Sequence, residues 1–354
     1  MGTIIIFTLD IGSARNRRMH ETFSIGVDFG GTNLRIASYG GDVELLDTIV
    51  APTRLGDGRE AVIRDMCEAI EALGKKDYGG RRLTGIGVGS PGPLELPQGI
   101  LRNPPNLPGW DGFNLREAIK SAIGREITLE SDANAAALAE QKWGTGRTYG
   151  VESLCMLTLG TGVGNGLILD GSIWHGSTGM GGEGGHIIVQ DIDGAACGCG
   201  GTGCLEQYAS ATAILRMAVE IMGADAPASS HEVALMAGAG DRRCLQVFKR
   251  VGHALAVALT ALINTLNLPL YTIGGGACEA WDLFAPVMFR ELRARSYVYR
   301  LTAPDILQTT SLEPHKTYIL RAELGSNAGL LGACLLPLQE KKSLPQAAGE
   351  LLPG

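Results

Sequence analysis

The 354-residue sequence lacks three features that would place it quickly in a class of proteins. It has no surplus of basic charge, because its formal net charge is -7 at pH 7, and this argues against a surface for nucleic acid. No apolar run reaches the length of a membrane-spanning helix. The first residues have neither the basic start nor the cleavage site of a signal peptide. We therefore expect a cytoplasmic protein that binds neither nucleic acid nor a membrane.

The two commonest nucleotide-binding patterns are also missing. No G-x4-G-K-[ST] string occurs, and the glycine-rich turns lead from a strand into another strand, which excludes the dinucleotide-binding fingerprint. The composition is that of a globular enzyme, since 45% of the residues are hydrophobic and 19% are charged, enough to build the cores of two domains.

Two glycine-rich turns between apolar strands, at residues 24–40 and 157–169, are the first positive signal. Glycine lets backbone N–H groups approach phosphate oxygens closely. An ordinary structural hairpin would need the same residues, but the repetition predicts two related domains, each with one phosphate-binding turn. The residues concerned are Gly30, Gly31, Thr32 and Asn33 in the first turn and Gly160, Thr161, Gly162, Gly164 and Asn165 in the second.

A histidine and three cysteines stand close together in a second glycine-rich stretch. They are His186, Cys197, Cys199 and Cys204. Three thiolates and one imidazole fill a tetrahedral shell, so the pattern predicts a structural zinc ion with no open position. The apparent binding energy of such sites, roughly 10–16 kcal/mol, could order a loop that buries little apolar surface. The alternative is a set of unligated or transiently oxidised thiols. The other five cysteines are scattered among apolar runs, as in a reduced intracellular protein.

The same stretch carries two glutamates, Glu183 and Glu206, which metal binding would bring together as a polar binding site. The string E-x-G-H followed by C-x-C-G-x2-G-C-x-E resembles the ROK family of bacterial sugar kinases and sugar-responsive repressors. The resemblance extends over residues 24–336. It implies that Glu183, His186 and Glu206 hydrogen-bond sugar hydroxyls.

The resemblance also implies a fold, namely the two-domain α/β architecture of the actin-like ATPases (ribonuclease H-like), with a cleft between the domains and a zinc-bound loop. The turns would then bind ATP, with Asp28 near Mg2+ and Gly274 and Gly275 near adenosine, although residues 274–276 are equally a plain strand-to-helix turn. The predicted division is a peripheral extension at 1–23, a small domain at 24–131 completed by a helix at about 323–336, a large domain at 132–322, and a tail at 337–354.

A strand runs into an alanine-rich helix at Ser131–Asp132. An aspartate at this place is most often a helix cap, whereas in ROK kinases it is the catalytic base. We expect the helix dipole to lower the pKa of Asp132; the loose transition state of phosphoryl transfer tolerates a weak base. Ser131 departs from the asparagine usual in ROK glucokinases, which affects sugar discrimination.

Residues 90–110 are dense in proline and glycine and predict an ordered surface loop. Its string N-L-P-G-W resembles the substrate loop of ROK glucokinases, so Gly92 and Asn106 are added to the sugar-binding residues. Elsewhere, hydrophobic periodicity and apolar runs predict helices at 61–73, 208–222, 241–264 and 323–336 and strands at 83–89 and 268–276.

The leading hypothesis is an ATP-dependent kinase of glycolysis that phosphorylates the 6-hydroxyl of a hexose, with glucose expected first, acting as a homodimer or homotetramer. An N-acetylglucosamine or N-acetylmannosamine kinase and a fructokinase stay open as alternatives, as does polyphosphate as a second donor. A repressor of this family would need a helix-turn-helix domain, which the strand-like residues 1–23 do not supply. A non-catalytic sugar sensor is disfavoured by the intact Asp132 and both turns.

Overall fold

Two five-stranded sheets, one in each half of the chain, organise the structure. The computed structural model describes residues 21–41, 45–305 and 311–339. The first sheet has the order β3 (Leu45–Pro52), β2 (Asn33–Tyr39), β1 (Thr22–Phe29), β4 (Arg82–Ser90) and β7 (Thr128–Ser131). The second has the order β10 (Ser172–Ile173), β9 (Val163–Leu169), β8 (Leu154–Leu159), β11 (Leu270–Gly274) and β12 (Tyr318–Arg321).

The two sheets repeat one topology. In each, three consecutive strands form an antiparallel meander. A fourth strand pairs in parallel with the first strand of that meander, and a fifth pairs in parallel with the fourth. The glycine-rich turns join β1 to β2 and β8 to β9, so they occupy equivalent positions in the two sheets. Each sheet therefore carries one of the two glycine-rich turns.

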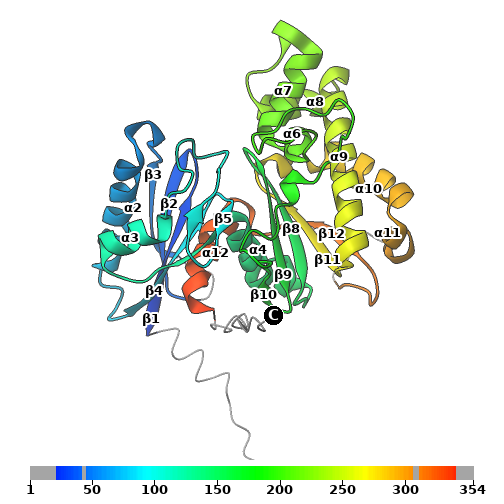
Figure 1. Cartoon of the computed structure of the whole chain (residues 1–354). Helices are drawn as coiled ribbons and strands as arrows, with labels where there is room; N and C mark the ends of the chain where they lie inside the picture. Colours follow the sequence, from blue (N-terminus) through cyan, green and yellow to red (C-terminus); the bar gives the residue numbers. More distant parts are fainter. Residues whose placement is uncertain (1–20, 42–44, 306–310, 340–354) are drawn as a thin grey trace, which may run out of the picture.

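Helices cover the outer face of each sheet, and the two lobes stand side by side (Figure 1). On the small lobe these are α2 (Arg59–Gly74) and α3 (Leu115–Ile123), whose apolar residues join those of β1, β2 and β4 in one core. On the large lobe the core is formed by β8, β9 and β11 with α7 (Ala211–Met222), α8 (Ser230–Gly238), α9 (Arg242–Leu266), α10 (Trp281–Arg295) and α11 (Tyr297–Thr302). Short elements complete the chain: the hairpin β5 (Leu94–Glu95) and β6 (Ile100–Leu101), and the turns α5 (Thr145–Thr148) and α6 (Glu206–Ala209).

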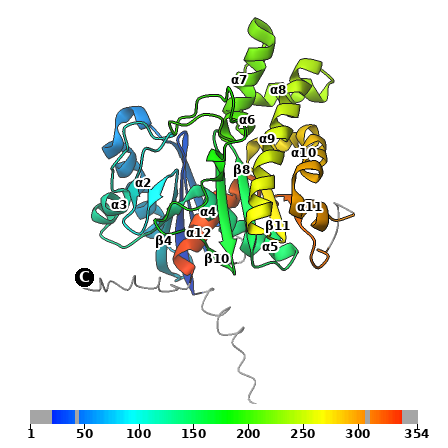
Figure 2. The same cartoon turned by 45° about the vertical axis from the view of Figure 1, so that its right-hand side comes forward.

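Two inner helices, α4 (Asp132–Trp143) and α12 (Ala328–Leu335), hold the lobes together (Figures 1 and 2). Helix α4 follows the small sheet but packs on β8 and β9, while α12 follows the large sheet but packs on β1 and β4. The two helices also pack on each other. Their approach is close because small residues face one another: an ideal Cβ on Gly332 would lie 1.8 Å from the carbonyl oxygen of Ala135. The lobes are therefore joined by nearly direct backbone contact.

Two predicted helices differ from those observed. The helix expected at 323–336 begins at Ala328, because Gly325 has a φ of 56° and residues Gly325–Asn327 form a 3-10 turn. The helix expected at 208–222 is broken at Ser210, whose backbone is extended. Its side chain accepts a hydrogen bond from the N–H of Ala213, so Ser210 caps α7.

The expectation that no apolar run reaches membrane-spanning length is wrong for α9. This 25-residue helix is long and apolar enough to cross a membrane by length and composition. Of the most apolar 18-residue stretch of this helix, 56% is buried inside the protein. There the helix packs against α7, α8 and α10. Its composition is explained by that interior position.

A substitution at the crossing of α4 and α12 tests this joint. We expect Gly332→Ala to lower the free energy of unfolding by about 1–3 kcal/mol, because the new methyl group has to push apart two backbones that nearly touch. Gly238→Ala at the end of α8 is the matched control, since nothing lies within 4 Å of its ideal Cβ. Denaturant unfolding of both variants measures the difference; equal stability of the two would contradict the packing described.

Candidate active site

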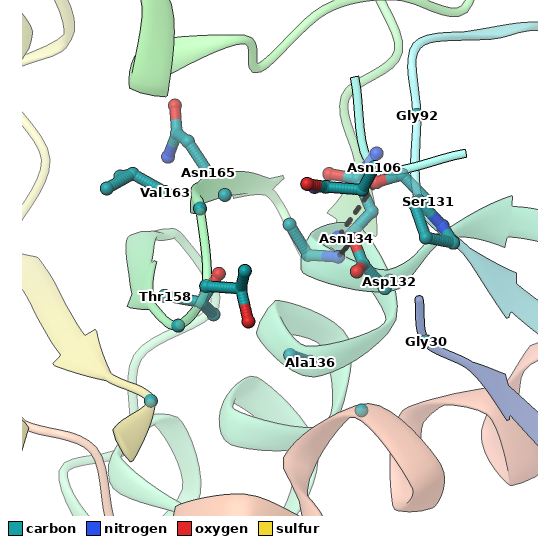
Figure 3. A pocket seen from close by; sticks show the side chains of 18 of the residues that line it. Gly30, Gly92, Asn106, Ser131, Asp132, Asn134, Ala136, Thr158, Val163 and Asn165 are labelled. Carbon is teal, nitrogen blue, oxygen red and sulfur yellow. Dashed lines mark hydrogen bonds between the residues drawn. The ribbon is translucent and has the colours of Figure 1, made fainter. Parts of the chain in front are cut away.

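A cleft of about 480 Å3 lies between the lobes. It is lined by both glycine-rich turns, the β7–α4 junction, the 91–106 loop, the segment leading to His186, and the 3-10 turn before α12. Figure 3 shows Ser131, Asp132, Asn134 and Asn106 on one side of this cleft and Thr158, Val163 and Asn165 on the other. Segments from both lobes that carry predicted binding residues thus line one space.

Asp132 is the first residue of α4 and faces this cleft. Its Oδ1 atom accepts a hydrogen bond of 2.7 Å from the N–H of Ala133, while the helix is capped by Ser131, whose Oγ accepts from the N–H of Asn134. Desolvation, followed by the charge of Asp28, raises the pKa of Asp132 to about 7. The expectation that the helix dipole lowers the pKa of Asp132 is therefore wrong in sign. Burial by the surrounding protein and the charge of Asp28 outweigh the dipole.

Asp28, at the end of β1, is paired with Arg35 on the neighbouring strand β2. The Nε of Arg35 donates to the Asp28 carboxylate at 2.9 Å, and its guanidinium also donates to the carbonyl of Ser326 at 2.7 Å. Arg35 therefore ties the first turn to the 3-10 turn before α12. The carboxylate of Asp28 stays at the cleft surface, where it can approach a cation.

Both glycine-rich turns present backbone donors to the cleft. Their carbonyl groups are engaged elsewhere: the Gly30 carbonyl accepts from Thr53 Oγ1 at 2.6 Å, and the Thr161 carbonyl accepts from Thr212 Oγ1 at 2.9 Å. Within the described ranges, no protein atom accepts a hydrogen bond from the N–H groups of Gly31, Thr32, Thr161 and Gly162. Two sets of unpaired N–H groups facing one cleft suit a chain of phosphates.

Carboxylates line the part of the cleft beside the second turn. The Oε2 of Glu206 accepts a hydrogen bond of 3.0 Å from the N–H of Val163, which fixes it next to Gly162. Glu183 opens onto the cleft near Gly92, yet surrounding protein raises its pKa through desolvation; His186 partly offsets this and Glu206 adds to it. Two acidic groups and an imidazole in one wall provide several hydrogen-bond acceptors and donors for a polyhydroxylated ligand.

The predicted metal ligands come together behind that wall. The ligand atoms of His186, Cys197, Cys199 and Cys204 all lie within 4.8 Å of one another. The Cys199 and Cys204 sulfurs are 3.7 Å apart, and the Cys197 sulfur is 3.6 Å from Nδ1 of His186. These separations exclude a disulfide and match sulfurs that share one tetrahedral ion at about 2.3 Å. The donor set therefore fits zinc.

The predicted sugar- and nucleotide-binding residues all line the cleft except two, Asn33 and Gly274. Asn33 begins β2, where its carbonyl accepts from the N–H of Gly30 and closes the turn. Gly274 is buried at the end of β11 against Met156 and Ala322, and it is Gly275, with a φ of 86°, that reaches the cleft. Asn165 reaches it only in part, since its amide donates inward to the carbonyl of Met156 at 2.9 Å.

Four polar cleft residues escaped the sequence analysis: Arg35, Asn134, Thr158 and Ser326. Arg35 could have been found, because it lies opposite Asp28 in the antiparallel hairpin. Asn134 looked like one more polar residue in an alanine-rich helix. It is buried, its Nδ2 donates to Glu130, and its Oδ1 has no hydrogen-bond partner among the described residues. Both atoms of this amide are thus enclosed by protein, so Asn134 holds Glu130 in place and offers no open acceptor to the cleft.

Comparison with known proteins identifies the family to which this sequence and structure are similar. The model of the ROK family matches residues 24–340. Glucokinase from Thermotoga maritima is 33% identical over 87% of this chain and 95% of its own. The ROK hexokinase from Thermus thermophilus has 33% identity and a TM-score of 0.72 over 89% of this chain and 97% of its own. The ROK family glucokinase from Streptomyces griseus, in complex with glucose and AMPPNP, has 27% identity and a TM-score of 0.73 over 90% of this chain and 100% of its own.

The relatives do not share one activity by name. N-acetylmannosamine kinase from Shigella boydii is 30% identical over 90% of this chain, and the xylose repressor from Caldicellulosiruptor bescii is 27% identical over 92%. What they share is the fold: the solved structures confirm the predicted two-domain actin-like architecture with its interdomain cleft. With its family match over residues 24–340 and its glucokinase relatives at about one-third identity, this chain belongs to the ROK family.

Proposed function

We propose that this protein is an ATP-dependent hexose kinase that transfers the γ-phosphoryl group to a sugar 6-hydroxyl, with glucose as the preferred acceptor. The observation that carries the proposal is the position of Asp132. Its carboxyl, with a pKa of about 7, lies in the cleft between two phosphate-suited turns and a wall of sugar-suited polar groups. A base that titrates near neutral pH is what a hydroxyl acceptor needs.

The roles in the transfer follow from these positions. Asp132 orients the attacking hydroxyl and takes its proton as the oxygen bonds to the γ-phosphorus and the bond to the β-phosphate breaks. The unpaired N–H groups of the two turns bind phosphate oxygens. They stabilise the negative charge that develops on the leaving ADP as the bond to the γ-phosphorus breaks. Asp28 is the carboxylate placed to approach the Mg2+ that accompanies ATP as part of the donor substrate. Charge stabilisation by these groups supplies most of the rate.

Sugar recognition is assigned to the wall that carries Glu183, His186 and Glu206, together with Gly92, Asn106 and Ser131. Carboxylates accept from sugar hydroxyls, and the imidazole of His186 can donate from Nε2 because its Nδ1 faces Cys197. Glucose kinases and an N-acetylmannosamine kinase among the relatives both use hexoses, so the N-acetylhexosamines are the second candidate acceptors.

Zinc is assigned to His186, Cys197, Cys199 and Cys204. With all four positions filled by protein, the ion supplies structural order and activates no water. Around it, the loop is pinned by the N–H of Val189 donating to the Gly203 carbonyl at 2.8 Å and by the N–H of Leu205 donating to the Ile187 carbonyl at 2.9 Å. Glu183 and Glu206 stand at the two ends of the segment that these hydrogen bonds hold together.

The acceptor is tested with an ATP-coupled assay over glucose, mannose, glucosamine, N-acetylglucosamine, N-acetylmannosamine and fructose. We expect glucose to give the highest kcat/KM, with mannose or glucosamine measurably used, because the short Ser131 leaves room for water. Ser131→Asn should sharpen the glucose-to-mannose ratio; asparagine still caps α4. An unchanged ratio would remove Ser131 from sugar recognition, and an N-acetylhexosamine above glucose would overturn the glucose assignment.

Asp132→Asn tests the base. The amide keeps the shape but accepts no proton, so we expect turnover to fall by at least about 100-fold, while hexose binding measured by calorimetry largely survives. Asp241→Asn, which alters an aspartate at the start of the remote helix α9, serves as the matched control and should retain activity. Retention of more than a few per cent of turnover by Asp132→Asn would exclude Asp132 as the base.

Zinc removal tests the loop. Elemental analysis of protein purified without chelators should find about one zinc per chain, and Cys199→Ala should lower hexose affinity by about tenfold before it unfolds the protein. The reason is that the metal holds the sugar-binding loop, whereas each lobe has its own apolar core. Cys67→Ala, a buried cysteine of the small-lobe core, should keep the zinc. Protein without zinc would refute this assignment.

A further inference from the structure

An ion pair outside the assigned site joins the two lobes beside the cleft. Glu130 lies on β7 at the edge of the small sheet and is 3% exposed. Its Oε1 accepts from the N–H of Ser131 at 2.8 Å and from Nδ2 of Asn134 at 3.0 Å. Its Oε2 is 2.5 Å from Nε2 of His175. Glu130 therefore fixes the strand end that precedes Asp132 and binds His175 from the other lobe.

His175 belongs to a segment of the large lobe, residues 174–183, that runs from β10 to Glu183. The segment is folded back on itself, since the N–H of Gly181 donates to the His175 carbonyl at 2.8 Å. It also contacts the small lobe a second time, where the N–H of Leu96 donates to the Thr178 carbonyl at 3.3 Å. The contact at Leu96 carries no charge, so the ion pair is the one charged link between this segment and the small lobe among the described residues.

We propose that His175 is a positioning residue for the sugar: in its protonated form it clamps the 174–183 segment onto Glu130 and so sets Glu183 relative to Asp132. The proposal rests on the hexose kinase function given above. Both ends of the clamp adjoin assigned residues, because Glu130 precedes Ser131 and Asp132 directly and the segment of His175 ends at Glu183. Movement of the clamp would change the distance between the sugar-binding wall and the base.

Electrostatics makes the clamp dependent on pH. The hydrogen bond to Glu130 raises the pKa of His175 above its usual value, burial opposes this, and the Glu130 charge adds to the rise. The charged groups on neighbouring elements include Asp132, Glu140 and Lys142 on α4, Glu183 at the end of the segment, and Glu95 on β5, which is paired with Arg102. None of them is among the causes that shift the pKa of His175.

The sign follows from the raised value. Because the folded pKa of His175 lies above that of a free histidine, the clamp is fully present below the free value of about 6.5 and is lost as pH rises through the folded pKa. A neutral imidazole can still donate one hydrogen bond to Glu130, but it no longer carries the charge that makes such a bond strong. Hexose affinity should therefore fall on the alkaline side.

Two variants separate charge from shape. His175→Arg keeps a cation at all working pH values, and His175→Gln keeps a neutral hydrogen-bond donor. Glucose dissociation constants are measured by calorimetry without ATP from pH 6 to 9, together with hydrogen exchange of the 174–183 segment. Wild-type affinity should weaken by about 3- to 10-fold across the raised pKa of His175. The Gln variant should be weak and lack this step, while the Arg variant should stay tight and lack it too.

The outcomes are distinguishable. If wild-type protein binds no hexose in the panel, the proposed function fails, yet alkaline loss of exchange protection in residues 174–183 that is absent from His175→Gln would still support the clamp. If wild type binds glucose and His175→Gln reproduces its pH dependence, the clamp is refuted. Should His175→Arg not fold, the comparison of wild type with His175→Gln in both measurements decides alone.

Discussion

The close contact between α4 and α12 is the constraint on which the rest of the structure depends. Each helix starts at the edge of one sheet and packs on the other, and their backbones meet where Gly332 faces Ala135. Because both helices begin at the cleft, this contact sets the mutual position of Asp132, at the start of α4, and of the turn that binds Arg35, just before α12. The two phosphate-suited turns are fixed by the same pair, since β1 packs on α12 and β9 packs on α4.

A second consequence concerns charge. Burial of the Asp132 carboxyl at the start of α4, together with the charge of Asp28 from β1, disfavours the carboxylate form and raises the pKa of Asp132 to about 7. Asp28 has a cationic partner of its own, Arg35. Glu183 and Glu206 line the cleft together with His186, and His186 also belongs to the cysteine cluster. The proposed metal site, the proposed sugar-binding wall and the proposed His175–Glu130 clamp therefore all involve one part of the large lobe.

Much of this could be predicted from sequence because the signals are local. The turns at Gly30 and Gly162, the helix start at Asp132 and the cysteine spacing each fall within a few residues. The structure brings the two turns and Asp132 to one cleft, and it groups the cysteines with His186, which lines that cleft. What could not be predicted depends on distant contacts. The raised pKa of Asp132 comes first from burial by the surrounding protein and then from Asp28, about 100 residues away in sequence. Local reasoning gave only the helix dipole and the wrong sign. The roles of Asn134 and His175 depend on their contacts with Glu130, which the sequence does not show. The break at Ser210 depends on the change of chain direction between α6 and α7.

The proposed reaction brings a phosphate donor and a sugar hydroxyl together in one cleft, with Asp132 as the base. Phosphorus NMR of the protein incubated with glucose and MgATP tests this most directly, because it identifies the product and the bond that is formed. We predict that hexose 6-phosphate and ADP appear in equal amounts and that ATP is stable without sugar. Bound glucose with no ATP consumed, or inorganic phosphate released without any sugar phosphate, would contradict the account.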